Sequence, residues 1–198
     1  MMTNKLPEFQ PWPKIYRYFR DVIVTEKIDG TNAQVFISED LETVAAGSRT
    51  RWITPEQDNH GFAAWVEANK DELRKLGPGS HFGEWWGSGI QRGYGLPKGE
   101  KRFSLFNTYK WLDDKVRPKC CHIVPVLYKG PNSAVMIMAA SELLLNHGSQ
   151  ASPGFKNPEG IVIFNIAGNF CQKFTFGGDG HKEAAKERER LAKMKELS

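Results

Sequence analysis

Cysteine is scarce in this sequence, and its three copies show no metal-binding spacing. Cys120 and Cys121 are adjacent, and Cys171 stands alone. An odd number of cysteines without a regular framework argues against a secreted domain held together by disulfides. We therefore expect a reducing, cytoplasmic environment.

Long hydrophobic runs are also missing. The amino terminus, MMTNKLPEFQPWPK, contains no apolar core of a signal peptide. The most apolar later stretch, residues 134–145, is interrupted by Ser141 and Glu142 and is too short to cross a bilayer. The five histidines are scattered without the spacing of metal ligands. These absences argue against a membrane protein and against a metal site built from histidine or cysteine.

A mild basic excess and many aromatic side chains are present instead. The formal net charge is +4 over 198 residues, and 12% of the residues are aromatic. Such a charge suits a nucleic-acid partner but is also common in proteins without one. Aromatic rings can stack on bases, although core filling accounts for most of them. Composition alone therefore leaves the function open.

Residue patterns predict an α+β fold with antiparallel sheets and flanking helices. Strand patterns occur at residues 21–27, 32–37, 43–47, 81–86, 101–111, 122–128, 160–166 and 169–176. Helical spacing occurs at 61–76 and 133–146, and the charged residues 181–198 predict a solvated terminal helix. Short turns join successive strands, which favours antiparallel pairing. The length suits one domain spanning residues 1–198.

The segment around Lys27 carries the first chemical signal. Lys27 ends a predicted apolar strand and is followed by a tight turn at Asp29 and Gly30. An amine attacks phosphorus only when it is unprotonated, a state that burial or neighbouring cations favour. This tetrapeptide by itself is equally compatible with an ordinary hairpin that has a lysine at its edge.

Five further segments follow in an order that strengthens the chemical interpretation. With Lys27-Ile28-Asp29-Gly30, the ordered set resembles the motifs of the covalent nucleotidyltransferases, which include DNA ligases, RNA ligases and mRNA capping enzymes. The other segments are Ser48-Arg49-Thr50, Phe82-Gly83-Glu84-Trp85, Phe103-Ser104-Leu105-Phe106, Asn157-Pro158-Glu159-Gly160-Ile161-Val162 and Gln172-Lys173-Phe174-Thr175. The runs EKIDGTN and GEWWGSGIQ resemble the ATP-dependent RNA ligases of phage type most.

This resemblance implies a nucleotidyltransferase fold and an activity. ATP and Mg²⁺ or Mn²⁺ would be the cofactors, and RNA or an RNA-containing nick would be the substrate. A covalent lysyl-AMP would serve to join a 3′-hydroxyl to a 5′-phosphate, in the cytoplasm of a bacterial or phage-infected cell. The alternatives are a DNA ligase, a capping-type guanylyltransferase, or a catalytically silent nucleic-acid-binding module of the same fold.

The resemblance also implies roles for individual residues. Lys27 would be the nucleophile that attacks the α-phosphate. The nucleotide-binding residues would be Glu26 beside adenine, Asn32 near the phosphates, Arg49 at the ribose or the 5′-phosphate, Glu84 at a ribose hydroxyl, Phe106 stacked on adenine, Glu159 at the metal ion and Lys173 at the α-phosphate. Arg51 is a weaker candidate for the role of Arg49, and Arg92 is a candidate substrate contact.

Two departures from the family pattern remain. The last motif commonly carries two lysines separated by one residue, but here Thr175 stands at the second place. Either this hydroxyl suffices or another cation, with Lys182 as the candidate, replaces the lysine. No separate C-terminal OB-type domain is expected after the last motif, so an accessory protein or domain is a candidate for substrate binding.

Overall fold

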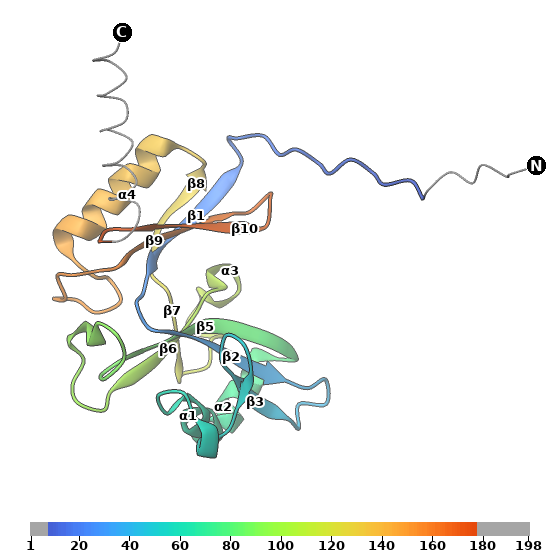
Figure 1. The fold of residues 1–198 in the computed structure, drawn as a ribbon, viewed down its shortest axis with the longest axis vertical. Coiled ribbons are helices and arrows are strands. Elements are labelled where there is room, and N and C mark those ends of the chain that lie inside the picture. The colour runs from blue at the N-terminus through green and yellow to red at the C-terminus, as the bar shows by residue number, and fades with distance from the viewer. Residues whose placement is uncertain (1–7, 178–198) are drawn as a thin grey trace, which may run out of the picture.

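The computed structural model describes residues 8–177, which contain two β-sheets lying one above the other in Figure 1. The first sheet has four strands in the order β10-β9-β1-β8, and the second has six in the order β4-β3-β2-β5-β6-β7. The consecutive strands β1 and β2 belong to different sheets, so the chain crosses between the sheets at residues 28–30. The turn after Lys27 therefore lies at the junction of the two sheets.

The four-stranded sheet is antiparallel throughout and is covered by one helix. Its strands are β1 (Asp21–Lys27), β8 (Val126–Pro131), β9 (Gly160–Asn165) and β10 (Phe170–Thr175). Val22 and Val24 of β1 pack with Leu144 of α4 (Ala134–His147). Because successive side chains of a strand point to opposite faces, Thr25 and Lys27 face away from α4 and line the cavity between the sheets.

The six-stranded sheet also has one covered face. Its strands are β2 (Thr31–Ile37), β3 (Val44–Gly47), β4 (Trp52–Ile53), β5 (Gly79–Gly87), β6 (Lys101–Leu105) and β7 (Cys121–Ile123). The helices α1 (Phe62–Ala68) and α2 (Lys70–Leu73) bring Phe62 and Leu73 into the largest core cluster, against Val35 and Trp85 of the sheet. The opposite face of this sheet looks toward β1.

The predicted antiparallel α+β character is confirmed, with one exception. The strands predicted at 21–27, 32–37, 43–47, 81–86, 160–166 and 169–176 and the helix predicted at 133–146 all form, with ends shifted by at most two residues. The exception is β7, which pairs parallel to β6. Within the described residues, no helix has both the length and the apolar content needed to cross a bilayer.

Two predicted strands were too long. The strand predicted at 101–111 ends at Leu105, because Asn107 accepts a hydrogen bond from the backbone N–H of Lys110 and caps a new helix, α3 (Thr108–Trp111). The strand predicted at 122–128 is two strands in different sheets, β7 and β8, separated by Pro125. Proline has no N–H to continue a ladder, and the Pro125 carbonyl instead accepts a hydrogen bond from the backbone of Glu26 at 2.9 Å.

The helix predicted at 61–76 is broken into three pieces. Asn69 separates α1 from α2, and a 3₁₀ turn, Arg74–Leu76, follows. The Asn69 side chain donates to the carbonyl of Trp65 at 2.7 Å, a local bond by which asparagine competes with helix geometry. The short strand β4 had no clear sequence signal. The helix predicted at 181–198 lies outside the described residues.

Candidate active site

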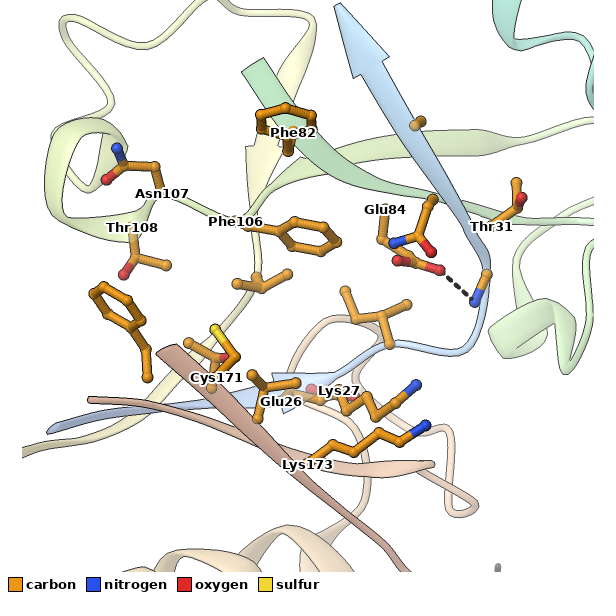
Figure 2. Close-up of a pocket in the computed structure, with 18 of the residues that line it drawn as sticks. Glu26, Lys27, Thr31, Phe82, Glu84, Phe106, Asn107, Thr108, Cys171 and Lys173 are labelled. Atoms are coloured by element: carbon orange, nitrogen blue, oxygen red, sulfur yellow. Dashed lines mark hydrogen bonds between the residues drawn. The ribbon is translucent and has the colours of Figure 1, made fainter. Parts of the chain in front are cut away.

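A cavity of about 1000 Å³ opens between the two sheets and contains most of the predicted site residues (Figure 2). Its walls come from β1 and the following turn, from β2, β5 and the β6–α3 connection, and from β9 and β10. Predicted residues in the lining are Glu26, Lys27, Asn32, Arg49, Glu84, Phe106 and Lys173. Arg51 is exposed outside this lining. The fold thus gathers side chains that are up to 147 positions apart in the sequence, from Glu26 to Lys173.

Lys27 lies on the cavity side of β1 and forms an ion pair with Glu159. Its Nζ is 2.6 Å from Oε2 of Glu159, and the two side chains are 23% and 16% exposed. The register of the sheet places these two side chains close together, because Gly160 at the start of β9 is directly opposite Lys27. Glu159 therefore enters the site from the residue just before β9. A carboxylate at this place can hold the Lys27 ammonium or share a cation with a bound phosphate.

A second amine lies on the same face. Lys173 of β10 is opposite Val162 of β9, which in turn is opposite Thr25 of β1. Figure 2 shows the Lys27 and Lys173 side chains extending in the same direction. By the same register Thr175 lines up with Lys27 across Gly160, which has no side chain. The question of Thr175 or Lys182 stays open, since Lys182 lies outside the described residues.

The facing sheet supplies a carboxyl group and two aromatic rings. Asn32 of β2 is opposite Glu84 of β5, so both point into the cavity, whereas the neighbouring Trp85 belongs to the core. Phe106 is 41% exposed and lies beside Phe82, which is 55% exposed and also lines the cavity. Sequence reasoning missed Phe82, although it shares the face of Glu84 two residues later. Two partly exposed rings at the cavity offer stacking surfaces for a flat base.

Glu84 contacts the turn that follows Lys27. Its Oε1 accepts a hydrogen bond from the backbone N–H of Gly30 at 3.1 Å, shown dashed in Figure 2. A Cβ on Gly30 would lie 2.5 Å from the carbonyl oxygen of Trp85, so this close approach requires glycine. Burial raises the pKa of Glu84 to about 7, against the opposing effects of the Lys27 charge and the Gly30 hydrogen bond. The carboxyl group therefore changes its protonation near neutral pH.

Glu26 is buried at the wall of the cavity and is held by the protein backbone. Its side chain is 1% exposed, and Oε2 accepts hydrogen bonds from the backbone N–H groups of Gln150 at 2.8 Å and Ala151 at 3.0 Å. The place of this carboxylate beside adenine stays a prediction. Adjacent residues of a strand point to opposite faces, so the carboxylate is directed away from the Lys27 amine, although Glu26 still borders the cavity. Burial raises the pKa of Glu26 more than these hydrogen bonds lower it.

Glu26 variants distinguish a structural role from a nucleotide contact. We expect Glu26→Ala to lower the free energy of unfolding by about 1–3 kcal/mol, because backbone N–H groups lose their acceptor. Glu26→Gln keeps a carbonyl oxygen at the same place and should stay close to the original protein. Urea denaturation of the three proteins measures the effect. If the alanine variant had unchanged stability and a raised KM for ATP, the result would support the predicted contact between Glu26 and adenine.

Arg92, the candidate substrate contact, is bonded within the protein, and its substrate role stays a prediction. Its guanidinium bonds to Asp29 and to the segment before Glu159, so its donors are directed at the protein itself. Among the described residues, no group of three or more His, Cys, Asp or Glu side chains is arranged to hold a metal ion. A divalent cation at Glu159 would therefore need phosphate and water oxygens as its other ligands, as Mg²⁺ commonly does.

The two facing sheets with a lysine between them define a nucleotidyltransferase fold, and solved structures of the Naegleria gruberi RNA ligase share it. A mutant of that ligase with ATP and Mn is 20% identical, with a TM-score of 0.59 over 87% of this chain and 58% of that chain. A mutant with AMP and Mn is 22% identical, with a TM-score of 0.59 over 80% of this chain and 50% of that chain. The ligase with PPi is 21% identical, with a TM-score of 0.58 over 85% and 52% of the two chains.

The family assignment comes from the sequence itself. The model of the RNA ligase family matches residues 20–176, which span every motif described above. This chain belongs to the RNA ligase family. A comparison with curated proteins gives no match. The chain spans about half the length of the Naegleria ligase structures.

Proposed function

We propose that this protein is an ATP-dependent RNA ligase that forms a covalent lysyl-AMP on Lys27. The observation that carries the proposal is the position of Lys27, whose amine lies in the cavity at 2.6 Å from Glu159. Glu84, Phe106 and Lys173 line the same cavity. Membership of the RNA ligase family and the shared fold support the choice of nucleotide and substrate.

The first step joins AMP to the protein. The unprotonated Nζ of Lys27 attacks the α-phosphorus of ATP and a P–N bond forms. The bond to the bridging oxygen breaks, pyrophosphate leaves, and the nitrogen loses one proton to solvent. Phe106 would stack on adenine, ionised Glu84 would accept a hydrogen bond from a ribose hydroxyl, and Asn32 would lie near the phosphates. Lys173 would neutralise charge on the α-phosphate, where negative charge must be stabilised during transfer.

A divalent ion fits the carboxylate of Glu159. A bound Mg²⁺ or Mn²⁺ would supply positive charge against the phosphate oxygens. The Glu159 carboxylate, whose Oε2 lies 2.6 Å from the Lys27 amine, would hold this ion close to the attacking group.

The later steps need a nucleic acid. An oxygen of an RNA 5′-phosphate attacks the AMP phosphorus, which breaks the P–N bond and releases Lys27. A 3′-hydroxyl then attacks the activated 5′-phosphate, forms the phosphodiester bond and expels AMP. Arg49 is exposed at the edge of the cavity and is suited to contact the incoming 5′-phosphate. An accessory protein or domain that grips the RNA is part of this proposal.

Labelling with nucleotide tests the proposal against its alternatives. The protein is incubated with labelled ATP, GTP or NAD and Mg²⁺ or Mn²⁺, and then separated under denaturing conditions. We expect a covalent adduct with ATP alone that survives alkali and is lost in hot acid, as expected for a P–N bond, followed by sealing of a 5′-phosphorylated RNA nick. An adduct with GTP would indicate a capping-type enzyme, and preferential sealing of DNA would indicate a DNA ligase. The absence of any adduct would indicate a silent binding module.

A further inference from the structure

Two chain segments that are distant in sequence must be held together for Lys27 to meet Glu159. One is the turn Ile28 to Gly30 after β1, and the other is Asn157 to Glu159 before β9. The register between β1 and β9 starts at the pair of Lys27 and Gly160, so no ladder bonds continue beyond it. A third segment, the glycine-rich loop between β5 and β6, contacts both.

Arg92 of this loop bridges the two segments directly. Its Nε donates to Oδ2 of Asp29 at 2.8 Å. Its Nη1 donates toward the Asn157 carbonyl and side-chain oxygens, both at 3.1 Å, and toward the Pro158 carbonyl at 3.3 Å. The rigid fork of a guanidinium is suited to link several acceptors in a defined geometry. Arg92 therefore ties the turn after Lys27 to the residues immediately before Glu159.

Tyr94 contacts the same turn from the buried side. Its hydroxyl accepts a hydrogen bond from the backbone N–H of Asp29 at 2.9 Å and donates toward the carbonyl of Lys27 at 3.5 Å. The side chain is 0% exposed, and its ring stacks on Phe155 with centroids 4.6 Å apart. Burial raises the pKa of Tyr94 further above its ordinary value, so the hydroxyl keeps its proton and can donate.

The loop adopts an unusual backbone to present these two residues. Tyr94 has φ of 52° and Gln91 has φ of 44°, in the left-handed region that non-glycine residues rarely occupy. The Tyr94 carbonyl is held by the hydroxyl of Ser152, which donates to it at 2.7 Å. Such backbone conformations persist only where surrounding contacts impose them, and they are frequent near functional sites.

We propose that Arg92 and Tyr94 are positioning residues that hold Lys27 in line with Glu159 and thus with the α-phosphate. The inference rests on the proposed function, because it assigns these residues to the adenylylation step. Neither residue needs to touch ATP. Transfer depends steeply on the placement of the attacking atom, and an error of about 1 Å can cost about 100-fold in rate.

Kinetics of single variants provide the first test. We expect Tyr94→Phe, which removes only the hydroxyl, and Arg92→Ala to lower the rate of adenylylation at saturating ATP by roughly 10- to 100-fold. The KM for ATP should stay within about threefold, since Phe106 and Glu84 are unchanged. Arg92→Lys keeps the charge without the fork and should recover only part of the rate. The matched controls Tyr128→Phe and Arg74→Ala remove hydrogen bonds to the carbonyls of Pro131 and Leu41 and should retain the original rate.

A second readout does not depend on ATP. The nucleotide-free protein is treated with trinitrobenzenesulfonate, and modification of Lys27 is followed by peptide mass spectrometry. The ion pair with Glu159 should slow modification in the original protein, and loosening of that pair should speed it several-fold in Tyr94→Phe and Arg92→Ala. Circular dichroism confirms that each variant is folded.

The two readouts separate this inference from the proposed function. Failure of the original protein to take up AMP would count against the proposed function, and Lys27 modification would then decide the inference alone. Unchanged modification of Lys27 in both variants would overturn it. A rate within twofold of the original would also overturn it, as would a loss that resides wholly in the KM for ATP.

Discussion

Lys27→Arg is expected to abolish transfer of AMP to the protein, with a loss of at least about 1000-fold in adduct formation. A guanidinium keeps the positive charge that pairs with Glu159 but stays protonated, so it offers no lone pair to phosphorus. Lys27→Ala should lose the adduct equally while also removing the ion pair. The measurement is labelling with ATP and a divalent metal under denaturing separation.

Lys27→Arg removes only the nucleophile, whereas Lys27→Ala removes both the nucleophile and the ion pair with Glu159. Lys156→Ala is the control, because Lys156 is exposed and donates to the carbonyl of His147 at 3.0 Å, outside the residues that line the cavity. It should label at the original rate. An adduct that persists in Lys27→Arg, or that maps by mass spectrometry to another lysine, would contradict the role of Lys27.

Glu159→Ala is expected to lower adenylylation by roughly 100- to 1000-fold, because the site would lose the carboxylate proposed to hold the divalent ion. Glu159→Gln keeps the size and the hydrogen-bond acceptor of the side chain but loses the charge. If the charge holds a cation, the glutamine variant should require a higher concentration of Mg²⁺ or Mn²⁺ for half-maximal labelling. Titration of the metal at saturating ATP measures this shift.

A second glutamate variant shows whether the change in metal dependence is specific to Glu159. Glu142 is exposed on α4 and does not line the cavity, so Glu142→Ala should show the original metal dependence. If Glu159→Ala were labelled at the rate of the original protein, Glu159 would not be a ligand of the metal ion. A rate loss in Glu159→Gln without any change in metal dependence would limit Glu159 to holding Lys27.

Much of the site could be predicted because its residues lie in short motifs with strong local signals. Lys27 ends a strand of β-branched residues, and Asp29 and Gly30 are typical turn residues. The strand and the turn after it could therefore be predicted from the sequence. Strand period also indicates that the side chains of Glu26 and Lys27 point to opposite faces of β1. Phe82 could have been found by the same period from Glu84.

Other site residues had no usable signal. Tyr94 is one aromatic residue in a glycine-rich loop, and the sequence does not reveal that its hydroxyl reaches the turn after Lys27. Arg92 was noticed only as a candidate substrate contact, because the choice between an external and an internal partner depends on which segments surround it. Its bonds to Asp29 and Asn157 span 63 and 65 positions.

The sequence by itself determined the family, the order of the motifs and most strands, because these depend on residue identity and on local periodicity. Only the tertiary structure decided which strands share a sheet. Pro125 divides a stretch that resembles one strand into β7 and β8, which belong to different sheets. The connection from β1 to β2 crosses from one sheet to the other, so Lys27 at the end of β1 lies between the two sheets. The pairing of Lys27 with Glu159 joins residues 132 positions apart. Local propensity contains no information on that distance, which is set by the antiparallel register of β1 and β9 and by the packing of the two sheets.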